Sequence, residues 1–194
     1  GILGPKTPRG QTRASPWQSL PPLLAPPGVT ALAGQVLRLN GQPLGDVTLQ
    51  IKEKTARTDR TGRFLLSSIP PGHREMMING RTASRPGRTY GMFEVGVNVT
   101  EGQTNVLPYT IWMPRIDTAH AVRIPSPTTA EVVVTTPRIP GLELRIPPGT
   151  VIRDYWKQIV TQISITPIPV DRPPFPLPKD VEVPLYFTVQ PGCA

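Results

Sequence analysis

Apolar and polar residues alternate in short runs along most of the chain. Val47, Leu49 and Ile51, for example, fall on one face of an extended segment. A period of two residues is typical of half-buried β-strands, whereas an amphipathic helix needs a period of 3.6 residues. No part of residues 29–116 keeps the helical period long enough for a helix. The pattern therefore predicts an all-β protein with almost no helix.

The first predicted domain, residues 29–116, holds short strands separated by turn residues. The expected strands are 30–39, 46–52, a strand–turn–strand over 56–66, 75–80, 90–99 and 104–113. Asn40-Gly41 predicts one hairpin turn, because both residues tolerate positive φ. Asp59 and Gly62 predict a second hairpin turn. This spacing of strands and turns is typical of an antiparallel β-sandwich.

The second predicted domain, residues 117–194, has strands interrupted by prolines. Pro148 and Gly149 form a predicted turn, and the final strand has no obvious partner, which suggests that the domain continues beyond Ala194. The expected strands are 119–125, 130–136, 142–146, a hairpin over 151–165 with its tip at 154–157, and 183–190.

A proline-rich segment precedes the last predicted strand. Residues 167–184 contain seven prolines in 18 positions, and proline lacks the N–H group that a strand ladder needs. Apolar residues such as Ile168 and Phe175 favour docking onto a β surface, with Phe175 as the anchor. Polyproline II geometry loses little entropy on docking because φ is already restricted. The alternative is a solvent-exposed spacer.

Residues 1–28 form a third part, a predicted extended arm. Seven prolines occur there, so neither a helix nor a central strand fits. Leu20, Leu23 and Leu24 allow the arm to dock onto a neighbouring surface, and a flexible tether is the alternative.

Four sequence features of the first domain carry a resemblance. They are Gly34-Gln-Val and the runs 40–47, 58–64 and 69–72, which read NGQPLGDV, TDRTGRF and IPPG. In this order they resemble the carboxypeptidase regulatory-like domain over residues 31–116. The resemblance implies a seven-stranded, transthyretin-like (prealbumin-like) sandwich and a binding or spacer module. Fold alone implies no activity.

Each of these features has a physical role in such a sandwich. Gly41 and Pro43 shape the first turn, Asp59 caps the second turn through its side chain, and Gly62 supplies positive φ there. Phe64 is expected in the core, where an aromatic ring buries a large area.

The second domain carries a further resemblance. Its run 165–176, ITPIPVDRPPFP, and the run 186–192, YFTVQPG, are similar to the region ahead of the repeat array in large bacterial YD-repeat (Rhs-type, teneurin-like) proteins. The resemblance implies a plug-like β region that follows a transthyretin-related domain. No YD repeat or toxin domain is present in this sequence.

Charge and composition bear on the partners. The formal net charge is +8, and the basic excess lies before residue 117. Aromatic residues make up 6% of the chain and do not interleave with arginines as base stacking requires, so no nucleic-acid partner is expected. The apolar runs are too short for a membrane span.

No catalytic or metal-binding pattern stands out. His73 follows a turn, His120 falls in a predicted strand, and neither accompanies a nucleophile motif. The lone Cys193 excludes an internal disulfide and a Cys-rich zinc site. We therefore expect no cofactor, no metal and no enzymatic activity.

Three functional interpretations follow. The first is a structural plug and spacer module of a secreted or surface bacterial YD-repeat toxin or adhesin, whose partner is the rest of a larger polypeptide. The second is a carbohydrate- or protein-binding accessory domain. The third is a self-assembling protomer whose proline-rich arm packs onto a neighbouring copy.

Overall fold

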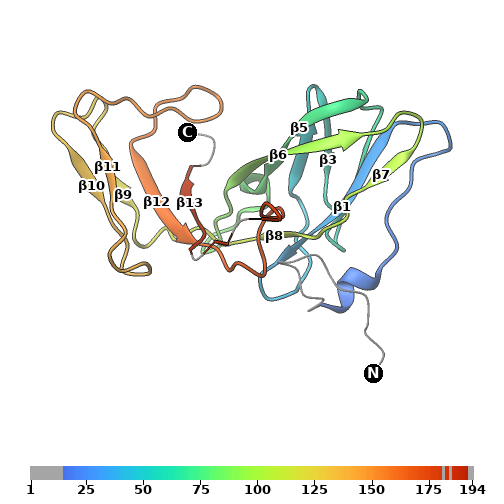
Figure 1. Ribbon diagram of the computed structural model, residues 1–194, viewed down its shortest axis with the longest axis horizontal. Helices are drawn as coiled ribbons and strands as arrows, with labels where there is room; N and C mark the ends of the chain where they lie inside the picture. The colour runs from blue at the N-terminus through green and yellow to red at the C-terminus, as the bar shows by residue number, and fades with distance from the viewer. Residues whose placement is uncertain (1–14, 181, 184, 192–194) are drawn as a thin grey trace.

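The computed structural model describes residues 15–180, 182–183 and 185–191 (Figure 1). Residues 1–14 of the predicted arm, Pro184 of the proline-rich segment, and Cys193 lie outside the described residues. Within the described ranges the chain forms thirteen strands, two short 3₁₀ turns and no α-helix, which confirms the all-β prediction. The 3₁₀ turns are η1 (Pro16–Ser19) and η2 (Gly80–Ala83).

Residues 29–116, which we call the first unit, form a sandwich of two sheets. One sheet has the order β4-β1-β7, with β8 pairing further along β1, and the other has the order β3-β2-β5-β6. The strands are β1 (Ala31–Arg38), β2 (Thr48–Ile51), β3 (Lys54–Arg57), β4 (Arg63–Ser67), β5 (Gly72–Asn79), β6 (Met92–Val99), β7 (Thr104–Val106) and β8 (Ile111–Met113).

The two predicted hairpin turns are turns, but neither joins two strands of one sheet. After the turn at Gly41, Pro43 makes only an isolated bridge with Leu37, and the chain then enters β2 in the opposite sheet. The turn between Asp59 and Gly62 likewise leads from β3 in one sheet to β4 in the other. The hairpin predictions were wrong because alternation shows which face of a strand is buried, not which strand lies beside it.

The predicted strand 104–113 is also wrong, since it is two strands. Residues 107–110 separate β7 from β8 and include Pro108, which cannot donate to a ladder. Both short strands pair with β1 in parallel, while the other strand pairs of the unit are antiparallel. The strand expected from Tyr90 begins only at Met92, and Tyr90 makes an isolated bridge with Arg115.

The second unit, from residue 117 onward, consists of two small sheets around a separate apolar cluster. The final strand, expected to lack a partner, pairs antiparallel with β12, and His120 lies in a turn before β9 rather than in a strand. The sheets have the orders β10-β11 and β13-β12-β9. The strands are β9 (Val122–Arg123), β10 (Val132–Val134), β11 (Leu144–Ile146), β12 (Gln162–Pro167) and β13 (Phe187–Gln190).

Residues 15–28 lie on the first unit of their own chain. Ser15 Oγ donates a hydrogen bond of 2.6 Å to the carbonyl of Gly41, and Arg63 Nη1 donates one of 2.7 Å to the carbonyl of Pro21. Of the predicted leucines, Leu20 and Leu24 are exposed and Leu23 is partly buried, so polar contacts attach this part of the arm together with Leu23 at most.

Phe64 is 1% exposed and lies in the core between the two sheets. It pairs across β1 and β4 with Gly34, where a Cβ atom would lie only 2.8 Å from the Phe64 ring. A side chain at Gly62 would meet the Val36 carbonyl oxygen at 2.2 Å, and Gly62 also has φ of +75°. Both glycines therefore leave space that β1, β4 and the aromatic ring fill.

We expect Phe64→Ala to lower the free energy of unfolding of the first unit by roughly 3–5 kcal/mol, because it removes an aromatic ring from a packed core. Chemical denaturation measures the change. Val106→Ala, at a position 47% exposed, is the matched control and is expected to change stability by under about 0.5 kcal/mol. An unchanged midpoint for Phe64→Ala would contradict the packing described here.

Candidate functional site

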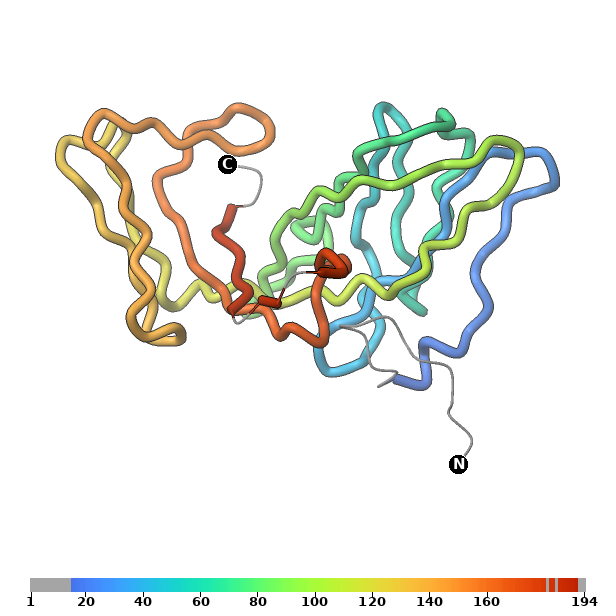
Figure 2. The backbone as a smooth tube through the Cα atoms, viewed as in Figure 1, coloured from blue at the N-terminus to red at the C-terminus, as the bar shows by residue number. Residues whose placement is uncertain are grey.

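Two segments of the chain join the two units, and Figure 2 shows both as tubes that pass between them. The first segment is the connector, residues 114–121. The second is the return segment, residues 168–186, which leaves β12 and reaches back to the first unit before β13 begins. The surface between the units, which we call the junction, is the candidate functional site.

A glutamine side chain on β13 makes hydrogen bonds to the first unit. Gln190 is 4% exposed, and its Nε2 donates a 3.1 Å hydrogen bond to the carbonyl of Met92, while its Oε1 accepts one of 3.3 Å from the Met92 N–H. The amide thus pairs with the first residue of β6 as a neighbouring strand would. A Cβ atom at Gly91 would lie 2.5 Å from the Gln190 amide, so a side chain there would force the amide to shift.

The hairpin tip predicted at residues 154–157 contacts η2 of the first unit. Asp154 is buried, and its Oδ1 accepts hydrogen bonds from the N–H groups of Trp156 (3.0 Å) and Gln158 (2.9 Å). Its Oδ2 lies 3.8 Å from Arg81 Nη1, and the Arg81 guanidinium stacks 5.3 Å from the centre of the Trp156 ring. A capped tip therefore holds a cation of the other unit.

Asp117 fixes the connector to the second unit. It is 9% exposed, and its N–H donates a 2.9 Å hydrogen bond to Thr166 Oγ1 on β12. His120 Nδ1 lies 2.8 Å from the carboxylate, and Arg138 Nη1 lies 3.8 Å away. Burial acts to raise the pKa of Asp117, but the hydrogen bonds from His120 and the charges of His120 and Arg138 outweigh it, so the pKa is lowered.

The return segment packs on the first core. Ile168 is buried in the first cluster, and Phe175 and Tyr186 pack against it. Arg172 donates a hydrogen bond to the carbonyl of Leu39, and its guanidinium lies 4.9 Å from the centre of the buried Trp112 ring. The surface that Phe175 meets is thus the sandwich of its own chain.

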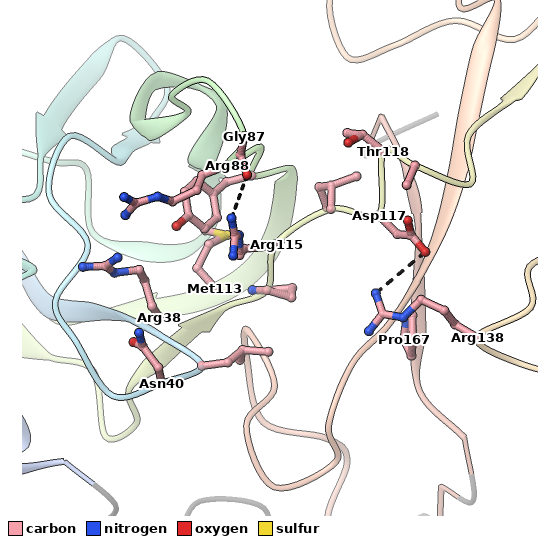
Figure 3. A pocket seen from close by; sticks show the side chains of 15 residues that line it. Arg38, Asn40, Gly87, Arg88, Met113, Arg115, Asp117, Thr118, Arg138 and Pro167 are labelled. Carbon is pink, nitrogen blue, oxygen red and sulfur yellow. Dashed lines mark hydrogen bonds and ion pairs between the residues drawn. The ribbon is translucent and has the colours of Figure 1, made fainter.

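An open cleft of about 830 Å³ lies beside the connector. Figure 3 shows Arg38, Arg88 and Arg115 on the side of the first unit and Asp117 with Arg138 on the other side. Both units therefore contribute charged groups to it.

Most residues singled out from the sequence lie away from the junction. Gly41 has φ of +85° in its turn, and Gly149, with φ of +78°, lies beside the exposed Pro148. Asp59 accepts hydrogen bonds from Thr61 and Arg63, which lower its pKa against the opposing effect of burial. Of the predicted residues, Phe175 belongs to the return segment.

The residues that join the units carried little sequence signal. The sequence pattern predicts Asp154 at a hairpin tip, but it gives no sign of the contact with Arg81. Gln190 ends an ordinary strand, and its partner Met92 is nearly a hundred residues away.

Within the described ranges, no group of three or more His, Cys, Asp or Glu side chains is placed to hold a metal ion. No helix of the described residues is long and apolar enough to cross a membrane. His73 Nδ1 is 3.0 Å from Asn98 Oδ1 on an exposed surface.

Comparisons with known proteins give little. No protein-family model matches the chain, and no curated protein matches it. The solved structures that resemble it include the Bacillus anthracis TIE protein, with 13% sequence identity and a TM-score of 0.38. That match covers 70% of this chain and 24% of the other, so this chain spans about a quarter of that protein. A structural likeness this distant shows nothing about the function of this chain.

We expect Gln190→Ala to lower the free energy of unfolding by about 1–3 kcal/mol, because it leaves the buried N–H and C=O of Met92 without partners. Denaturation monitored by tryptophan fluorescence measures it. Gln162→Ala, at an exposed position on the adjacent strand β12, is the control. Equal effects of the two substitutions would show that the contact with Met92 does not stabilise the junction.

Asp117→Asn is expected to make the protein less stable at pH 7, with a gap to wild type that closes in acid. A carboxylate whose pKa is lowered by folding stabilises the folded state above its unfolded pKa of about 3.9, and this contribution is lost as the pH falls through the lower folded pKa. Thermal midpoints between pH 7 and pH 2 test this. Asp171→Asn, at an exposed aspartate, is the matched control for the change of side chain.

Proposed function

We propose that this chain is a non-enzymatic structural module, a β spacer of fixed shape within a larger polypeptide. One observation carries the proposal: two segments of the chain join the two units, and the second segment buries Ile168 in the core of the first unit. A single connector would act as a hinge. The connector and the return segment, together with the contacts of Gln190 and Asp154, oppose hinge motion.

The resemblance to YD-repeat proteins allows either a plug or a spacer. A plug that enters a shell has to present apolar side chains to the wall of the shell. In the return segment, Phe175 and Ile168 already contact the first unit of the same chain. The contacts therefore favour the spacer role in a secreted or surface protein of that type.

Two further observations support the choice. Residues 15–28 pack on their own first unit, which disfavours exchange of this part of the arm between copies. The Asp117–His120 pair resembles a base with its orienting carboxylate, yet among the described residues no Ser, Thr or Cys side chain hydrogen-bonds to His120. The pair is fully explained by its role in holding the connector.

Residual dipolar couplings of the ¹⁵N-labelled chain test the fixed shape. Alignment tensors fitted separately to the two units are expected to agree in magnitude and orientation. In a double variant, Gln190→Ala with Asp154→Ala, we expect the tensors to diverge, because two of the contacts between the units are gone.

Tensors that already differ in the wild-type protein would show that the units move independently and would overturn the spacer proposal. Reproducible ester or peptide hydrolysis lost in His120→Ala would overturn its non-enzymatic part.

A further inference from the structure

We propose that the cleft beside the connector is a binding site for a ligand that carries oxyanion groups. This goes beyond the spacer role, which needs no ligand. Charged side chains line the cleft. Four arginines and one aspartate do so, and the aspartate is Asp117, which already has Arg138 and His120 as partners.

The three remaining arginines have no acidic partner. Within the described residues, none of Arg38, Arg88 and Arg115 forms an ion pair. Arg115 Nη2 donates a 2.6 Å hydrogen bond to the carbonyl of Gly87, which fixes its position and leaves its other N–H groups available. Three arginines on one side of the cleft give it a local excess of positive charge, which a bound anion offsets.

Two buried polar atoms in the same lining are unsatisfied. Arg38 Nε and the Tyr90 hydroxyl are both buried without a hydrogen-bond partner, and Tyr90 is only 2% exposed. A buried donor without a partner typically costs about as much as a lost hydrogen bond, so native proteins hold few of them. Neither atom is reached by solvent, so a ligand in the cleft contacts them only after side chains of the lining move. The three arginines without acidic partners remain the groups that a bound anion meets.

The shape and chemistry of the cleft narrow the ligand class. A volume of about 830 Å³ accommodates a small organic molecule. Guanidinium groups bind carboxylate, sulfate and phosphate through paired N–H···O contacts. Leu39, Ile116 and Pro167, which are partly exposed, add an apolar part to the lining. The site therefore suits a small ligand with at least two acidic groups on a short carbon frame.

Isothermal titration calorimetry with citrate, sulfate and inorganic phosphate, each in about 0.15 M NaCl, tests the proposal, since that salt concentration screens exposed charges. Saturable binding of at least one anion is expected. Citrate binding with no sulfate or phosphate binding would identify a carboxylate ligand, and the reverse would identify a tetrahedral oxyanion. Either result supports the site.

Matched variants locate the binding. Arg88→Gln is expected to weaken it about tenfold or more, the effect of losing a hydrogen bond to a charged group. Arg60→Gln changes the net charge equally at an exposed arginine outside the cleft and is expected to leave affinity unchanged.

The proposal is overturned if none of the three anions binds, or if Arg60→Gln weakens binding as much as Arg88→Gln does. The second result would identify general attraction to a basic protein.

Discussion

The core of the first unit depends on residues from the far end of the chain. Ile168, Phe175 and Tyr186 pack against a cluster whose other members all lie before residue 114. Proline at many positions of the return segment restricts φ before folding, so less conformational entropy is lost when the segment docks. The segment therefore acts as part of the first core, although its sequence belongs to the second half of the chain.

This arrangement makes the two units energetically dependent on each other. If the second unit moved away, Ile168 would leave a packed core, and the backbone groups of Met92 that Gln190 satisfies would lose their partner. Each loss is unfavourable on its own, one through apolar exposure and the other through an unpaired buried group. Polar and apolar contacts thus oppose the same motion.

Local features of the fold were predictable from sequence, and long-range ones were not. The turn at Asp59 depends on a side chain that bonds its own backbone two and four residues on, so its signal is contained in a few letters. The all-β class follows from a period of two for the same reason. The assignment of strands to sheets, the split at Pro108 and the contact of Gln190 with Met92 depend on which distant segments meet, and alternation carries no information about that.

The fixed junction and the proposed ligand site are physically linked. Residues of both units line the cleft, so its shape persists only while the units keep their relative orientation. Asp117 belongs to both features, since it attaches the connector to β12 through Thr166 and balances Arg138 at the cleft. A ligand that bound only the closed arrangement would in turn stabilise it, by an amount that grows with the logarithm of ligand concentration over the dissociation constant. The contacts that support the proposed spacer role are thus also the contacts that hold the arginines of the first unit opposite Arg138 of the second.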